Sequence, residues 1–280
     1  MTKDLQRLIR ETEFLPPGFQ IVPKLLLLLD DPESNSEELA ELIRVDPGLT
    51  TEVLRVCNSA FYSGGVRAET LSEAVMRIGL RAVYQVVMKV IASPVLSQPE
   101  KNYGAEQINL WRHSLAVATG AEFIARDRGD NSEVAFTAGL LHDIGKLVVN
   151  KALDGDYSGV LKEANEKMLS IHVVEKGIFN MDHADAGGIL LNRWNLPPNI
   201  VAAVRFHHKP AGAGESVRLA SIVNVANYLA FTIGQGSGYQ SYPRHVDPKA
   251  LTNLRMTIEE VDQQSDSVKE LFEKSLAAFN

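Results

Sequence analysis

Cysteine is nearly missing from this chain of 280 residues, because Cys57 is the only one. A lone cysteine excludes an intrachain disulfide and a zinc site built from several thiolates. Free thiols are typical of proteins in a reducing compartment. The cysteine content therefore favours a cytoplasmic protein, and we interpret Cys57 as a small core residue.

Long apolar segments are missing as well. The longest unbroken aliphatic run is the leucine run 25–29, whereas a membrane-spanning helix needs about 20 apolar residues. The first residues, MTKDLQRLIRETEF, mix both charges and contain no apolar signal core. We therefore expect no membrane partner.

An excess of positive charge is also absent. The chain has 28 Lys and Arg residues against 35 Asp and Glu residues, so its formal net charge is −7 at pH 7. An acidic protein gains nothing from the phosphate attraction that drives non-specific nucleic-acid binding. We therefore expect no nucleic-acid partner.

Helical periodicity is the main pattern that the sequence does contain. Apolar residues recur at intervals of three and four, turn residues separate segments of helix length, and strictly alternating runs are scarce. The pattern predicts an all-α fold of two packed helical subdomains. We expect the first in residues 1–100 and the second in residues 101–235, with a loop and C-terminal helices packing on the core in residues 236–280.

Several local signals refine this prediction. Asp46-Pro47 is typical of a helix entry, and Asn58 of a helix exit in the left-handed region. A connector is expected from Pro94 to Gly104. In the second subdomain we expect helices at about 106–126, 132–145, 182–194 and 216–231, with Gly145 ending the second of these helices.

Most of the seven histidines lie on the apolar faces of these predicted helices. Buried polar groups cost about 1–3 kcal/mol each unless they are paired. A single site, satisfied mutually or by a metal, would remove that cost. A histidine on an apolar helix face is nevertheless more often a hydrogen-bonded core residue, so spacing alone leaves both alternatives open. We expect His172 and His245 at the surface.

The segment 142–146, HDIGK, resembles the signature of the HD superfamily of metal-dependent phosphohydrolases. The resemblance implies that Asp143 bridges two metals and that Lys146 contacts phosphate. If the chain is an enzyme, these two are its catalytic residues. The metal ligands that the resemblance implies are His113, His142, Asp143, His183, His207, His208 and, at the last position, Asn227. Imidazole and carboxylate ligands suit a divalent iron, manganese, zinc or nickel ion.

Two departures from that superfamily reduce the expectation of catalysis. The last metal carboxylate is replaced by the neutral amide of Asn227, which is a weaker ligand. The cyclic-dinucleotide phosphodiesterase branch follows its paired histidines with an acidic residue and a DGxGYP stretch. Here His207 and His208 continue as KPAGAG at 209–214, so the loop that grips the substrate in that branch is absent.

The N-terminal half carries three further motifs, namely DPGL at 46–49, NSAFY at 58–62 and IGL at 78–80. Together with the degenerate HD-type pocket they resemble the HDOD family over roughly residues 15–231. HDOD modules are all-α and occur in bacterial signalling proteins. The resemblance implies a regulatory module with a protein partner in a signalling pathway.

Three functions are compatible with these motifs. The first is an HDOD-type signalling or interaction module, with or without a bound metal. The alternative is a metal-dependent phosphohydrolase or cyclic-nucleotide phosphodiesterase, which the retained histidines favour. The third is a sensor whose former catalytic cleft binds a nucleotide ligand without cleaving it.

Overall fold

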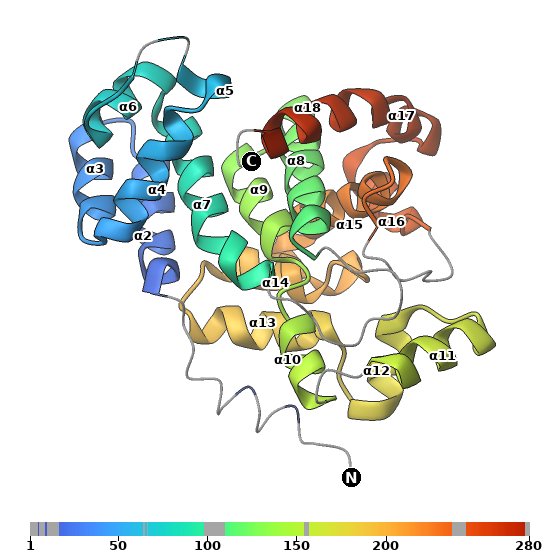
Figure 1. Cartoon of the computed structure of the whole chain (residues 1–280). Helices are drawn as coiled ribbons and strands as arrows, with labels where there is room; N and C mark the ends of the chain where they lie inside the picture. Colours follow the sequence, from blue (N-terminus) through green and yellow to red (C-terminus); the bar gives the residue numbers. More distant parts are fainter. Residues whose placement is uncertain are drawn as a thin grey trace.

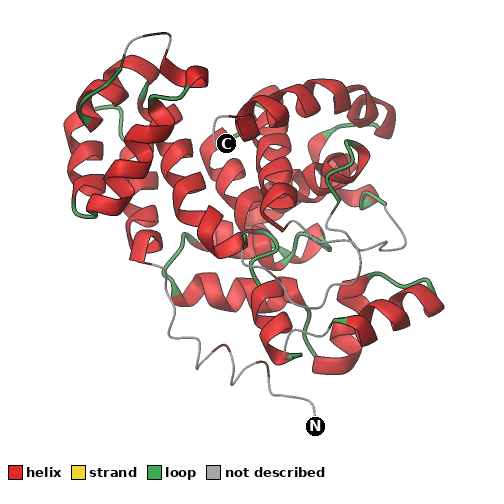
Figure 2. Cartoon of the chain, in the orientation of Figure 1, coloured by secondary structure: helices red, strands yellow, loops and turns green. Residues whose placement is uncertain are grey.

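The structure, a computed structural model, describes residues 5, 9, 17–63, 65, 67–97, 110–153, 157–236 and 245–277. Within this part of the chain all regular structure is helical and no strand occurs (Figure 2). The prediction of an all-α fold is confirmed. None of the helices in the described ranges has the length and hydrophobicity that crossing a bilayer requires.

The N-terminal helices form one group, seen in blue to teal in Figure 1. They are η1 (Pro17–Ile21), α2 (Val22–Asp30), α3 (Ser36–Arg44), α4 (Pro47–Cys57), α5 (Ala60–Ser63), α6 (Leu71–Ile78) and α7 (Leu80–Leu96). Asp46 accepts a hydrogen bond from the Leu49 amide at 3.0 Å and Pro47 occupies the first turn of α4. The predicted helix entry is therefore confirmed.

Asn58 follows α4 and fixes the loop that leads to α6. Its φ of −93° lies outside the left-handed region, so the backbone conformation we expected for it was wrong. The side chain instead holds the loop, because Nδ2 donates to the Ala68 carbonyl at 2.8 Å and Oδ1 accepts from the Ala68 amide at 2.8 Å. Arg77 adds a bond of 2.7 Å to the Cys57 carbonyl. The asparagine of the NSAFY motif thus acts as a structural clamp.

The remaining helices build the C-terminal part of the molecule. They are α8 (Leu110–Arg128), α9 (Ser132–Leu141), α10 (Lys146–Ala152), α11 (Ser158–Lys167), α12 (Ile171–Phe179), α13 (His183–Arg193), α14 (Pro198–Arg205), η2 (Pro210–Gly212), η3 (Gly214–Ser216), α15 (Val217–Thr232), α16 (Pro248–Leu254), α17 (Ile258–Gln263) and α18 (Ser265–Ala277). Helix α8 is central, because α7, α9, α15 and α18 all pack against it (Figure 1).

Glycines set the spacing of these central helices. A Cβ added to Gly139 of α9 would lie 2.9 Å from Cα of Ala118 on α8, and one on Gly120 would lie 3.4 Å from Cβ of Ala226 on α15. Real Cβ atoms do not approach backbone as closely as 2.9 Å, so α8 and α9 can pack at this distance only with glycine there. The close packing brings the ends of α8, α9 and α15 together.

The predicted subdomain boundary near residue 100 falls in 98–109, outside the described residues. Helix α7 continues through Pro94 to Leu96, so the connector predicted to start at Pro94 begins later. A proline removes only one helical hydrogen bond, and α7 ends two residues beyond it. The division of the chain into subdomains stays a prediction.

Helix α9 ends at Leu141, earlier than the predicted end near Gly145. Residues 142–145 form a turn instead, and Gly145 directly precedes α10. A Cβ on Gly145 would lie 1.9 Å from the His183 carbonyl oxygen and 2.5 Å from the Gly187 nitrogen. The expectation that Gly145 ends a helix was therefore wrong, and its role is to let the 142–145 turn contact the backbone of α13.

Replacing Gly145 with alanine should lower the free energy of unfolding by about 3 kcal/mol, because the methyl group must displace backbone rather than a flexible side chain. Urea unfolding followed by circular dichroism measures the change. Gly159→Ala in α11 is the matched control, since no atom lies within 4 Å of the added carbon. It should leave stability unchanged or raise it by up to about 1 kcal/mol. Equal effects of the two substitutions would contradict the packing argument.

Candidate metal centre

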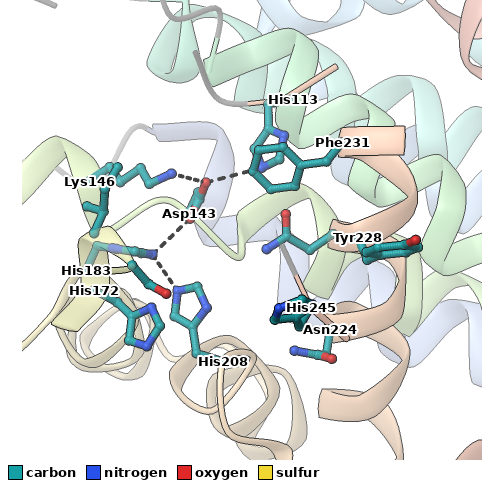
Figure 3. A pocket seen from close by; sticks show the side chains of 13 residues that line it. His113, Asp143, Lys146, His172, His183, His208, Asn224, Tyr228, Phe231 and His245 are labelled. Carbon is teal, nitrogen blue, oxygen red and sulfur yellow. Dashed lines mark hydrogen bonds and ion pairs between the residues drawn. The ribbon is translucent and has the colours of Figure 1, made fainter. Parts of the chain in front are cut away.

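The carboxylate of Asp143 lies at the centre of the histidine cluster (Figure 3). Its Oδ2 atom is 3.4 Å from Nε2 of His113 and 3.3 Å from Nε2 of His142. Its Oδ1 atom is 3.2 Å from Nε2 of His183 and 4.0 Å from Nε2 of His207. Histidines from α8, the 142–145 turn, α13 and the turn after α14 therefore face one carboxylate.

Two more side chains complete this arrangement. Lys146, the first residue of α10, donates from Nζ to Asp143 Oδ2 at 2.6 Å. Nε2 of His208 lies 2.9 Å from Nε2 of His183. His183, His207 and His208 form one set of potential ligands, and His113, His142 and Asp143 form another.

Acceptor oxygens determine which nitrogen of each histidine faces inward. Nδ1 of His142 lies 2.8 Å from the Gly139 carbonyl, and that of His207 lies 2.7 Å from the Val204 carbonyl. Nδ1 of His113 is 2.7 Å from the carbonyl of Gln235. A carbonyl can only accept, so each Nδ1 carries a proton, and each Nε2 presents a lone pair whenever its ring is neutral. Metal-binding histidines usually donate the hydrogen of their other ring nitrogen to an oxygen in this way, which fixes the orientation of the ring.

The inward atoms fit a divalent metal. Lone pairs on Nε2 of His113 and His142 face the Asp143 carboxylate, so acceptors face acceptors unless a cation lies between them. Two ligand atoms that each lie about 2.1 Å from a metal are about 3.0–3.4 Å apart at octahedral or tetrahedral angles, and the three shortest of these nitrogen–oxygen distances are 3.2–3.4 Å. Within the described part of the chain, no hydrogen-bond partner reaches His142 Nε2, His207 Nε2 or Asn227 Oδ1.

The electrostatics of the histidines agree with this arrangement. Burial lowers the pKa of His113 to about 3, despite the nearby Asp143. Burial also lowers the pKa of His207 and of His208 well below the usual range, and neighbouring histidines add to the effect. These three imidazoles are therefore neutral near pH 7, which is the form that binds metals.

The pKa values of Asp143 and His183 shift so that the charged form of each group is favoured, opposite to the shifts of the three neutral imidazoles. Burial disfavours the Asp143 carboxylate, but attraction to His142 in its protonated form and to the Lys146 ammonium outweighs that effect and holds the pKa of Asp143 well below the usual range. Burial likewise disfavours a charged His183, yet Glu175 and Asp143 on either side of the ring raise its pKa to about 10. His183 is therefore protonated near pH 7, and a metal bound at its Nε2 would have to displace that proton.

Glu175 on α12 is a site residue that the sequence analysis missed. It is fully buried, and its Oε2 accepts from the His183 amide at 2.8 Å and from His183 Nδ1 at 2.6 Å. Tyr157 donates its hydroxyl hydrogen to Oε1. The available signal was an acid beside Ile171 and Val174 on the apolar face of a short helix.

His172 also lies at the site, although we expected it at the surface. It is half-buried, and its ring stacks on that of His208 with centroids 4.1 Å apart and an interplanar angle of 14°. That expectation was wrong because α12 packs beside the turn that carries His208. His245 is exposed, as expected, and it too borders the cavity.

A cavity of about 240 Å³ opens beside Asp143. Asn227, Tyr228 and Phe231 of α15 line one side of it, and the Phe231 ring packs against His113 with centroids 5.4 Å apart. His142 and His207 are fully buried and are not part of the cavity wall. The structure thus brings all seven residues of the predicted metal set and Lys146 to one location, and metal binding by them stays a prediction.

Comparisons with known proteins agree with this architecture. The family model described as the HDOD domain matches residues 15–210. An HDOD domain protein of unknown function from Geobacter sulfurreducens superposes with a TM-score of 0.76 at 23% identity, covering 96% of each chain. A protein from Shewanella amazonensis SB2B, provisionally named a phosphohydrolase, gives 0.71 at 22% identity, covering 100% of this chain and 99% of that one. At these identities the likeness establishes the fold alone.

Sequence relatives are longer than this chain. An uncharacterized protein of Treponema pallidum (strain Nichols) is 29% identical over 231 residues, which are 80% of this chain and 44% of that protein. Ribonuclease Y of Lawsonia intracellularis (strain PHE/MN1-00) is 26% identical over 196 residues, which are 69% of this chain and 30% of that protein. The chain thus spans less than half the length of these curated relatives.

The fold and the site define an all-α protein with an HD-type histidine and aspartate pocket. The match over residues 15–210 makes the identification specific, and the chain belongs to the HDOD domain family.

Removing the Glu175 carboxylate should strongly destabilise the protein. In Glu175→Ala the amide of His183, its Nδ1 and the Tyr157 hydroxyl all lose a buried acceptor, which should cost about 3–5 kcal/mol of unfolding free energy. Chemical denaturation of the full chain measures this loss. Glu166→Ala on the exposed face of α11 is the control and should change stability by less than about 0.5 kcal/mol. Near-equal stabilities would show that Glu175 does not hold His183.

Proposed function

We propose that the protein is a metal-dependent phosphohydrolase that cleaves a phosphate ester in the cavity beside Asp143. One observation carries the proposal, namely that a single buried carboxylate joins two sets of histidines, with His113 and His142 at Oδ2 and His183 and His207 at Oδ1. The residues that would hold the metal are His113, His142, Asp143, His183, His207 and His208, with Asn227 as a neutral ligand.

A divalent metal would supply a water of lowered pKa and polarise a phosphoryl oxygen. The chain's own residues have separate tasks. Asp143 faces both histidine sets. Backbone carbonyls bind Nδ1 of His113, His142 and His207 and so keep the Nε2 atoms of these three rings pointed inward. The Lys146 ammonium lies in the cavity wall and offsets negative charge that develops on the phosphoryl group.

The relatives give limited support to this chemistry. Those named ribonuclease Y act, by their name, on RNA, which is a phosphodiester. The net charge of −7 argues against a long polyanion as the substrate of this chain. A small phosphate ester, such as a nucleotide, fits both the charge and the cavity better.

A second candidate function is a regulatory module that binds a nucleotide or a protein partner of a signalling pathway without hydrolysis. Two observations favour it. The neutral amide of Asn227 stands where the superfamily has a carboxylate, and residues 210–216 form two short 3-10 turns, η2 and η3, in place of a substrate-gripping loop.

Metal content and turnover of the purified full chain test the first function. We expect at least one equivalent of a transition metal by elemental analysis, and turnover of bis(p-nitrophenyl) phosphate or of a nucleotide in Mn²⁺ or Fe²⁺. Asp143→Ala should remove both, since it deletes the shared ligand. Asp127→Asn, a surface change, should alter neither.

The outcomes separate the two functions. Turnover that survives Asp143→Ala would identify a contaminant and defeat the proposal. Bound metal without turnover of any substrate in the panel, together with nucleotide binding by calorimetry, would favour the regulatory module instead.

A further inference from the structure

The two sides of the Asp143 carboxylate offer different electrostatic environments to a cation. We call His113, His142 and Asp143 Oδ2 the Oδ2 half of the site. We call His183, His207, His208 and Asp143 Oδ1 the Oδ1 half. Each half presents nitrogen ligands that fit a metal, so the difference between the halves lies in the charges that surround them.

A second buried carboxylate supports the Oδ1 half. Glu175 lies behind His183, where its Oε2 is 2.6 Å from Nδ1 and accepts its hydrogen. A carboxylate behind a ligating imidazole increases the basicity of that imidazole and adds negative charge near the metal. In the Oδ2 half, Nδ1 of both His113 and His142 meets only neutral backbone carbonyls.

The Oδ2 half already holds a cation that is not one of its metal ligands, whereas the proton of His183 in the Oδ1 half is one that a metal would displace. The ammonium of Lys146 is 2.6 Å from Asp143 Oδ2, the same oxygen that a metal in this half would share. Lys146 is only 6% exposed, so water screens its charge weakly. The amide of Asn227 adds no compensating negative charge, and it lies one turn before Phe231, whose ring packs on His113.

We propose that the two halves bind divalent cations with unequal affinity, and that Lys146 sets the difference. The Oδ1 half takes the first cation. The Oδ2 half takes the second only weakly, because a cation there must approach an oxygen that the ammonium already neutralises. The inference rests on the metal site of the proposed function, and it adds a positioning role for Glu175 and a metal-excluding role for Lys146.

Manganese titration of the full chain tests this inference without any substrate. Protein stripped with a chelator and dialysed is titrated with Mn²⁺, and bound and free ions are counted by electron paramagnetic resonance and calorimetry. We expect one tight site and a second at least about tenfold weaker. Lys146→Met keeps the length and burial of the side chain but removes its charge, and it should strengthen the second site at least about tenfold. Lys162→Met on the exposed face of α11 is the control and should change neither site.

Two further variants test the same inference by changing the charge at Asn227 and at Glu175. Asn227→Asp should also strengthen the second site, since it adds negative charge without changing side-chain size. Glu175→Gln should weaken the first site about 10–100-fold and leave the second unchanged. Circular dichroism and thermal unfolding establish that each variant is folded before its affinities are compared.

The results distinguish this inference from the proposed function. Two sites of equal affinity in the natural protein, or a second site that neither Lys146→Met nor Asn227→Asp strengthens, would overturn the inference alone. Absence of any bound Mn²⁺, confirmed with Zn²⁺ and Fe²⁺, would overturn the metal site and the proposed hydrolase together.

Discussion

The buried carboxylate of Asp143 constrains the whole C-terminal part of the molecule. An ionised group removed from water is strongly unfavourable unless charged or polar partners surround it closely. Here the compensating groups are Lys146 on α10 and His183 on α13, while His113 on α8 and His207 after α14 present acceptor nitrogens that a metal would join to the same carboxylate. The helices must therefore pack so that these side chains converge, and the arrangement can accept a metal for the same reason.

Backbone contacts at glycines make this convergence possible. Gly139 lets α9 approach α8, and Gly145 lets the turn that carries Asp143 contact α13. Side chains at these positions would separate the helices by more than the roughly 0.5 Å tolerance of a preorganised site. The precision of the site is thus a property of the scaffold, and the histidines alone would not provide it.

Helix α9 also connects the site to the N-terminal helices. Near its first turn, Glu133 is paired with Arg81 of α7 at 2.7 Å, and Thr137 is hydrogen-bonded to Tyr84 at 2.5 Å. After its last turn come His142 and Asp143. One helix thus touches the motif-rich N-terminal half at one end and the pocket at the other, so both halves of the HDOD domain contribute to the position of the candidate centre.

The sequence by itself determined the helical class and the structural role of Asp46-Pro47. It also identified the histidines and Asp143 as candidate site residues. Sequence reasoning could reach these conclusions because hydrophobic period and short motifs are local properties of the chain. Only the tertiary structure decided which oxygen of Asp143 each histidine faces, that Glu175 and Tyr157 support His183, and that His172 stacks on His208. The physical reason is distance along the chain. His113 meets the Gln235 carbonyl across 122 positions, and helix packing, which no local pattern encodes, determines such contacts.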